Sequence, residues 1–313
     1  MREAIVDATE RLLQLPPGVP VYVVMSGDLT SRGHAEEFPV AHTYLVSHWV
    51  RDASGLFCDG LDLEPDQVLT VPGNHDHWNG FEGPRRFRLL KPWNYLKRWP
   101  PAYTPWIFRT GLKTTPWVRP IQDPKGELLM EVYGIDSNAG LAAKSTNLRA
   151  QGRYSVAEIR KLGRLLNASF KRPLAVGMRR KIRVLVSHHG IYPNTNFKWY
   201  QSARPLDSAS QRALMLLANR RQIQVMLTGH FHEATHFGHI SALGTTAHTL
   251  NEIRAPSATQ GLPATGKQGF LVHQIHFANP GDTTVKWTVY LYHWHQGQFV
   301  TGPRSSPAYS FLI

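Results

Sequence analysis

The stretch DQVLTVPGNHD, residues 66–76, joins a short apolar run to a cluster of polar side chains. The run VLTV predicts a buried β-strand that ends close to Gly73. A turn at this place needs only Gly73 and Asn74, because both tolerate unusual backbone angles. His75 and Asp76 are not needed for a turn, so we ask whether other strands end in similar clusters.

Three other predicted strands end in polar groups. VYVVMSGD ends in Asp28, VLVSHHG contains His188 and His189, and MLTGHFH contains His230 and His232. In α/β sheets, ligands gather beyond the carboxyl ends of the strands, so we expect these groups to converge. Their oxygen and nitrogen donors suit Mn, Fe, Zn, Ni or Co. The lack of a cysteine cluster argues against a structural zinc site.

Strands and helices alternate along most of the chain, and strands alone follow from about residue 235. Helical spacing predicts helices near the N-terminus and over residues 155–167 and 207–221, with Ser155 and Glu158 as a capping box. Residues 35–54 can also form a helix, with Pro39 near its start. GFLVHQIHFA and TVKWTVYLYHWHQGQFV predict an antiparallel β-hairpin region at about residues 268–301. This order predicts a layered α/β fold in a single domain spanning residues 1–313.

The overall charge favours an anionic partner. Lys and Arg exceed Asp and Glu by 35 to 22, and the net charge of +13 attracts phosphate esters, nucleic acid or acidic lipid. The lone Cys58 cannot form an internal disulfide, which fits a reducing compartment. No apolar run approaches the roughly 18 residues of a membrane span, and residues 1–18 do not resemble a signal peptide. We therefore expect a cytoplasmic protein, and its oligomeric state stays open.

Four motifs in a fixed order resemble those of the calcineurin-like metallophosphoesterase superfamily: GD at 27–28, GNHD at 73–76, HH at 188–189 and GHFH at 229–232. The resemblance covers about residues 20–235. It implies a four-layer α/β/β/α sandwich of the metallophosphoesterase type that binds two divalent or trivalent transition-metal ions.

The resemblance also implies roles for single residues. Asp28 would bridge the two metals; Asn74, His188 and His230 would bind the second metal, and His232 the first. His75 would act as the general acid, with Asp76 orienting it. The implied reaction is attack of a metal-bound hydroxide on phosphorus, with His75 supplying a proton to the departing oxygen.

The substrate expected from the sequence is a phosphodiester, plausibly nucleotide-like. VYGIDSNAG, residues 132–140, is similar to a segment of cyclic-nucleotide-phosphodiesterase-like members. GDLTSRG and PGNHD differ from the GDxVDRG and RGNHE forms of protein Ser/Thr phosphatases, which disfavours that branch. The alternatives are a nuclease or a phospholipid-headgroup hydrolase on the same centre, or a catalytically impaired half-site that binds anions.

One motif of the superfamily has no counterpart here. The family's first strand ends in Asp-x-His, whereas the only acids before Asp28 are Glu3, Asp7 and Glu10. We therefore expect a missing first strand and the loss of two ligands of the first metal. A start assigned too late is the favoured explanation; the alternatives are a truncated chain and a protein that is truly mononuclear and impaired.

A basic and aromatic insertion is expected at about residues 78–128. Between Gly83 and Pro120 the chain has no acid, and it interleaves cationic and aromatic side chains (Arg85, Arg86, Arg88, Lys91, Lys97, Arg98, Arg109, Lys113 and Arg119, with Trp93, Tyr95, Trp99, Tyr103 and Trp106). Phosphate contacts and aromatic stacking would suit a nucleotide or single-stranded nucleic acid. The alternative is a surface insertion whose aromatic rings pack on the core.

Overall fold

The computed structural model describes residues 1–30, 37–51, 55, 57–77, 115–140, 151–191, 204–243, 246–258, 268–295, 298–301 and 307–313. The helices are α1 (Arg2–Val6), the π-helix η1 (Asp7–Leu12), α2 (Glu37–Val46), the 3-10 helix η2 (Pro65–Gln67), α3 (Asn74–His77), α5 (Val156–Lys171) and α6 (Ser208–Arg221). The strands of the first half are β1 (Val23–Met25), β2 (Trp49–Arg51), β3 (Phe57–Asp59), β4 (Val68–Thr70), β5 (Trp117–Gln122), β6 (Leu128–Gly134) and β7 (Gln151–Gly152). Those of the second half are β8 (Arg180–Val186), β9 (Arg204–Leu206), β10 (Val225–Thr228), β11 (Thr235–Leu243), β12 (Thr246–Arg254), β13 (Gly269–Phe277), β14 (Val285–His295), β15 (Gln298–Thr301) and β16 (Tyr309–Leu312).

The largest sheet has six strands in the order β11-β12-β10-β8-β6-β5. Its four inner strands run parallel, and β11 and β5 pair with them in antiparallel fashion. Because side chains alternate across a strand, Ile182, Val184 and Val186 of β8 face one core while Leu185 faces another. The sheet is therefore buried on both faces.

The second β layer contains two groups of strands. β13, β14 and β15 form an antiparallel sheet, with β16 also paired to β14, and β1 pairs with β4 in parallel. Leu69 of β4 and Trp287 of β14 share one buried core with Val184 of β8, a strand of the large sheet. The two β layers thus pack face to face.

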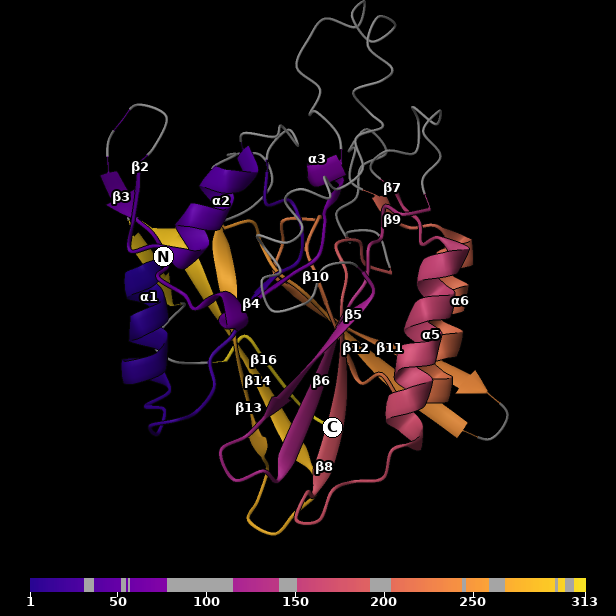
Figure 1. Ribbon diagram of the computed structural model, residues 1–313. Coiled ribbons are helices and arrows are strands. Elements are labelled where there is room, and N and C mark those ends of the chain that lie inside the picture. The colour runs from indigo at the N-terminus through magenta and orange to yellow at the C-terminus, as the bar shows by residue number, and fades with distance from the viewer. Residues whose placement is uncertain are drawn as a thin grey trace, which may run out of the picture.

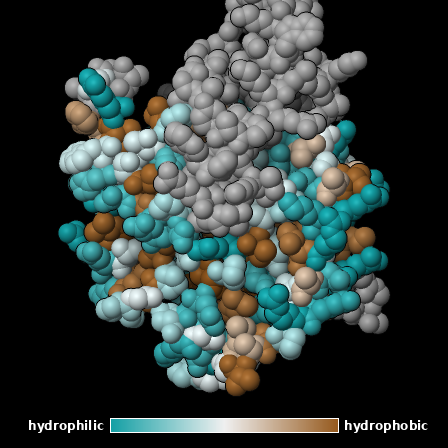
Figure 2. All heavy atoms as spheres, in the orientation of Figure 1, coloured by the Kyte–Doolittle hydropathy of each residue, from teal (hydrophilic) through white to brown (hydrophobic). Residues whose placement is uncertain are grey.

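Helices cover the outer faces of both β layers (Figure 1). Leu162 and Leu166 of α5 and Leu214 of α6 pack on the large sheet, and Ser155 caps α5 by accepting a hydrogen bond from the Glu158 amide at 3.0 Å. On the opposite side, Ala8 packs against the second sheet near Tyr292. Figure 2 shows hydrophilic side chains with scattered hydrophobic ones on the surface where α5 lies in Figure 1. The order helix, sheet, sheet, helix confirms the predicted four-layer α/β/β/α sandwich.

Two segments differ from the sequence-based expectation. Residues 117–122, placed inside the expected insertion at 78–128, form β5 at the edge of the large sheet, where Trp117 and Ile121 enter the core. Pro120 and the neighbouring basic residue hid this strand, and a proline is tolerated there because β5 is an edge strand. The helix expected around residues 35–54 ends at Val46, and β2 follows it. Residues 78–114 of the insertion lie outside the described residues.

A cavity of about 950 Å³ lies between β1 and β13. It is lined by consecutive residues of both strands, Val23–Met25 of β1 and residues 270–275 of β13. Because successive side chains of a strand point to opposite faces, a cavity lined by consecutive residues runs along the edge of each strand and not along one face. At one end it reaches Asp28 and His188. Within the described residues, no helix has the length and apolar character needed to cross a membrane.

Candidate metal centre

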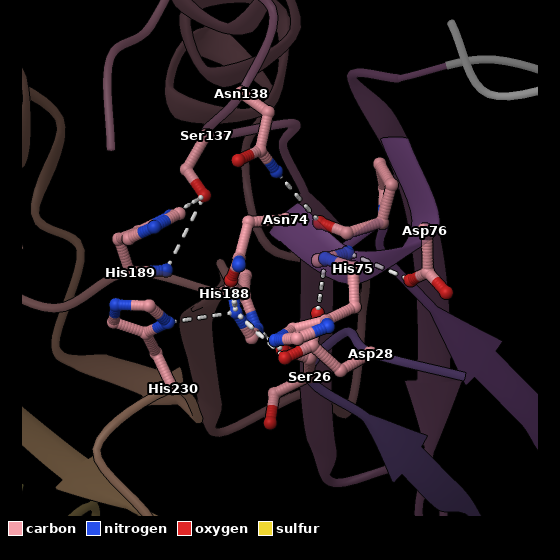
Figure 3. Close-up of polar contacts among 12 residues, drawn as sticks. Ser26, Asp28, Asn74, His75, Asp76, Ser137, Asn138, His188, His189 and His230 are labelled. Atoms are coloured by element: carbon pink, nitrogen blue, oxygen red, sulfur yellow. Dashed lines mark hydrogen bonds and ion pairs between the residues drawn. The ribbon is translucent and has the colours of Figure 1, made fainter. Parts of the chain in front are cut away.

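The carboxyl ends of β1, β4, β8 and β10 meet at one point between the two β layers. β1 leads to Asp28, β4 to Asn74, β8 to His188 and β10 to His230, and these side chains point toward one another (Figure 3). The expectation that the polar strand ends converge is therefore met for these four residues, which come from distant parts of the sequence.

The Nε2 atom of His188 lies at the centre of this group. It is 2.8 Å from Oδ1 of Asn74, 3.1 Å from Nδ1 of His230 and 3.3 Å from Oδ2 of Asp28. Asn74 and His188 are buried. A carboxylate, an amide oxygen and two imidazoles within hydrogen-bonding distance form a donor set that suits a transition metal.

The tautomer of His188 is fixed by the backbone. Its Nδ1 lies 2.8 Å from the carbonyl oxygen of Ser26, which can only accept, so Nδ1 carries the proton and donates it. In the neutral ring, the Nε2 lone pair then faces the oxygens of Asn74 and Asp28. A positive charge at this point, either a proton or a metal ion, relieves the repulsion between these lone pairs. The residues therefore fit a bound cation, and the backbone contact of His188 is of the kind that orients metal-binding histidines.

The pKa values of Asp28 and His188 reflect their close contact. Burial lowers the pKa of His188, but the charge of Asp28 and its hydrogen bond outweigh burial and raise that pKa above its usual value. Burial raises the pKa of Asp28, but the charge and hydrogen bond of His188, together with the charges of His75 and His230, lower it below its usual value. Asp28 is thus held as a carboxylate, the form that binds cations.

Glycines and unusual backbone angles allow the loops to approach so closely. A Cβ atom on Gly73 would collide with the carboxylate and the backbone nitrogen of Asp28, and one on Gly27 would collide with the His188 ring. Asp28, His230 and His232 have positive φ angles of 55°, 67° and 54°, which is uncommon outside glycine. These three are half of the six such non-glycine residues described, and clustering of that kind is typical of functional sites.

His75 and Asp76 belong to the short helix α3 beside the centre. The His75 amide donates to Oδ1 of Asp28 at 2.9 Å, and the His75 side chain is partly exposed. Asp76 is buried and accepts hydrogen bonds from the amides of Gly73 and Thr30, both at 2.8 Å. Burial first and the charge of Asp28 second raise the pKa of Asp76 to about 6. Asp76 therefore fixes the first turn of α3, and with it the backbone of His75, against the loop of Asp28.

His232 lies apart from the hydrogen-bonded group. It lines the same cavity as Asp28, His188 and His230. Within the described part of the chain, no hydrogen bond joins it to those residues. Burial lowers the pKa of His232, which favours the neutral imidazole that can bind a metal.

Two residues near the centre received no ligand role from the sequence. His189 is fully buried, and its ring centroid is 4.3 Å from that of His230. One nitrogen atom from each of His188, His189 and His230 could surround one ion. Ser137 contacts Nδ1 of His189 with its hydroxyl at 2.7 Å and accepts a hydrogen bond from the His189 amide at 3.3 Å. Ser137 lies three residues beyond Gly134, the last residue of β6, and this position just past a strand end is the signal that could have identified it.

Comparison with known proteins identifies one matching family profile. The profile described as "Calcineurin-like phosphoesterase" matches residues 2–234, which is most of the chain. No curated protein sequence matches significantly.

Several solved structures are similar at low sequence identity. GAP50, the anchor in the inner membrane complex of Plasmodium, is 15% identical with a TM-score of 0.37, and the match covers 78% of this chain and 64% of that one. The purple acid phosphatase PPD1 from yellow lupin seeds is 13% identical with a TM-score of 0.40, covering 79% and 40%. Vps29 from Entamoeba histolytica complexed with Zn²⁺ is 18% identical with a TM-score of 0.18, covering 29% and 44%. The chain thus spans less than two thirds of each of these structures.

Proposed function

The chain belongs to the calcineurin-like phosphoesterase family, and we propose that it is a metal-dependent phosphoesterase acting on a phosphodiester, plausibly a nucleotide-like one. Asp28, Asn74, His188 and His230 would hold one transition-metal ion. Asp28 and His232 would contribute to a second ion, for which the described residues offer fewer donors.

One observation carries the proposal. Donor atoms of Asp28, Asn74 and His230 lie 2.8–3.3 Å from a single imidazole nitrogen of His188. The gathering calls for a positive charge, because it places a carboxylate and an amide oxygen beside a histidine whose backbone contact leaves a lone pair directed at them. Metal binding explains both the choice of side chains and the direction in which they point.

The chemistry can be divided between the ions and the protein. When bound, transition-metal ions act as Lewis acids that activate water and polarise a phosphoryl oxygen. Asp28 would bind through its ionised carboxylate, and the Ser26 carbonyl would hold His188 in the tautomer needed for binding. His75 stands next to the ligand Asn74 with a partly exposed ring, a position from which it would donate a proton to the departing oxygen.

Single-stranded nucleic acid is the second candidate substrate. Nine basic residues and no acid lie between Gly83 and Pro120, directly after the loop of Asn74 and His75. A segment of this charge favours contact with several phosphates, and the affinity for a nucleic acid would then fall steeply with salt. A small nucleotide-like diester would respond weakly to salt.

A hydrolysis panel would test the proposal. The chain, supplied with Mn²⁺, would be assayed on bis(p-nitrophenyl) phosphate, p-nitrophenyl phosphate, cyclic nucleotides and single-stranded DNA at several salt concentrations. We expect diester hydrolysis that exceeds monoester hydrolysis and is lost in His188→Ala. Turnover that survives in His188→Ala, or the lack of turnover on every substrate, would contradict the proposed function.

A further inference from the structure

A buried ionic cluster lies behind the loops of the metal centre, and its residues have no role in the proposed reaction. We call it the Glu252 cluster: Glu252 and Arg254 on β12 and His239 on β11. Glu252 and Arg254 are fully buried and His239 is nearly so. β12 pairs with β10, and Thr228 at the end of β10 is aligned with Arg254. The cluster therefore sits where β10 leads into the loop of His230.

Glu252 contacts the loop that follows His188. Its Oε2 atom accepts a hydrogen bond from the amide of Ile191 at 3.1 Å and lies 2.7 Å from Nε2 of His239. A Cβ atom on Gly190 would collide with Oε1 of Glu252, so the carboxylate packs directly against this backbone. The position of residues 188–191 is thus set in part by Glu252.

Arg254 contacts the loop that carries His230 and His232. Its guanidinium carbon is 4.5 Å from the centre of the Phe231 ring and 4.6 Å from that of Phe237, so the cation lies between two aromatic rings. Its Nη1 atom is 3.8 Å from Oε1 of Glu233. Phe231 and Glu233 each directly follow one of the two histidines.

A direct contact joins Glu252 and Arg254. Nε of Arg254 donates to Oε1 of Glu252 at 2.7 Å. Burial raises the pKa of Glu252, but hydrogen bonding to His239 and the charge of Arg254 outweigh it and lower that pKa, so the carboxylate stays ionised. The loop of His188 is therefore linked to the loop of His230 through one chain of charge-assisted contacts.

Stability alone is a weak reason for such a cluster. Removing a carboxylate and a guanidinium from water carries a large desolvation cost, and well-packed apolar residues often serve a core equally well. A buried ionic pair does fix geometry, because its hydrogen bonds are directional. The geometry it would fix here is the distance between two proposed metal ligands.

We propose that Glu252 and Arg254 are positioning residues that hold the loops of His188 and His230 at the spacing required for metal binding. This inference rests on the proposed function, because it assumes that these histidines bind a metal. It assigns a role to two residues that do not touch the metal, the substrate or the reacting atoms.

The chain offers a matched control. Arg183 and Glu131 form a second buried ionic pair in the same sheet, with Nε and Oε2 separated by 3.7 Å and side chains only 8% and 7% exposed. This pair contacts Ser169 of α5 on the helix-covered face and not the loops of the metal centre. Glu131→Gln should therefore lower stability in the same way without moving the metal ligands.

The test is isothermal titration calorimetry, in which the metal-stripped full chain is titrated with Mn²⁺ to measure the Kd. Thermal unfolding of the same variants measures their melting temperatures. We expect Glu252→Gln and Arg254→Lys each to raise the Kd for Mn²⁺ by about 10-fold. This is the lower end of the effect usually caused by losing a residue that orients metal ligands. Glu131→Gln should lower the melting temperature and leave the Kd within about twofold of the wild-type value. Arg254→Lys keeps the positive charge, so it tests the inference even if Glu252→Gln fails to fold.

The possible failures can be told apart. Wild-type Kd values in both Glu252→Gln and Arg254→Lys would overturn the inference and leave the proposed function intact. An equal rise of the Kd in Glu131→Gln would also overturn it, since the effect would then follow from lost stability. A wild-type chain that binds no Mn²⁺ would overturn the proposed function and the inference together.

Discussion

Nε2 of His188 lies 2.8 Å from Oδ1 of Asn74, although 114 positions separate the two residues in the sequence. His188 follows β8 of the large sheet, and Asn74 begins α3 after β4 of the second β layer. The contact therefore spans the two β layers at the point where their strands end. A change that shifts one layer relative to the other will alter the candidate metal centre directly.

Gly73→Ala should disrupt metal binding through a steric effect. Its new methyl group would collide with the carboxylate and the backbone nitrogen of Asp28. We expect a loss of about 1–3 kcal/mol in the free energy of unfolding, as for other overpacked sites, together with weaker Mn²⁺ binding. Urea unfolding and Mn²⁺ titration measure the two effects. Gly163→Ala is the control, because the nearest atom to its Cβ position, Cδ1 of Leu217, is 3.8 Å away; equal Mn²⁺ binding in both variants would contradict the expected collision.

His75→Ala should lower turnover and leave the metal in place. The ring is assigned to proton donation, while the His75 backbone contacts Asp28 through its amide, which the substitution retains. Loss of a general acid typically lowers kcat by about 10²-fold or more. The measurement is kcat with bis(p-nitrophenyl) phosphate, alongside elemental analysis of bound metal. Loss of metal from His75→Ala would show that this residue serves binding and not proton transfer.

Glu158→Gln should weaken the pH dependence of stability between about pH 4.5 and 7. Burial raises the pKa of Glu158 from 4.5 to about 7, so in this window the folded chain binds more protons at this site than the unfolded chain does. The free energy of unfolding should therefore fall as pH rises through the window, and the substitution should remove that contribution. Urea unfolding at several pH values measures the slope. An unchanged slope in Glu158→Gln would contradict the prediction.

Gly163→Ala should stabilise the protein. Gly163 lies inside α5, and the nearest atom to its Cβ position, Cδ1 of Leu217, is at an ordinary contact distance of 3.8 Å. Replacing a glycine inside a helix by alanine contributes about 0.5–1 kcal/mol, because the unfolded chain loses freedom. A higher melting temperature with unchanged Mn²⁺ affinity is expected. A lower melting temperature would mean that α5 and α6 pack too closely for a methyl group.

The sequence predicts the layered fold because the patterns of its main elements are local. The period of the apolar residues in α5, its Ser155 cap and the alternation in β13 and β14 all depend on neighbouring positions, and each is present in the structure. β5 escaped prediction because Pro120 and basic residues interrupt its apolar pattern, and its burial depends on pairing with β6. Whether such a segment forms an edge strand depends on the strand that it pairs with, so its local sequence pattern does not predict it.

The candidate site could be predicted in part, for a related reason. Asp28, Asn74, His188 and His230 were identifiable because each follows an apolar run, and ligands gather beyond the carboxyl ends of strands in α/β folds. The contact of the Ser26 carbonyl with His188 has no sequence signal, since every residue carries a carbonyl group. Likewise, the link from Glu252 to Ile191 depends on the order of strands in the sheet, which the sequence did not specify.

Metal analysis of the full chain tests the central claim most directly. The wild-type protein and His188→Ala would be loaded with Mn²⁺, freed of unbound metal by gel filtration and examined by inductively coupled plasma mass spectrometry. Because Nε2 of His188 lies within 3.3 Å of donor atoms from Asp28, Asn74 and His230, we predict at least one tightly bound ion in the wild type and none in the variant. A wild-type chain that retains no metal, or a variant that retains as much as the wild type, would contradict the account.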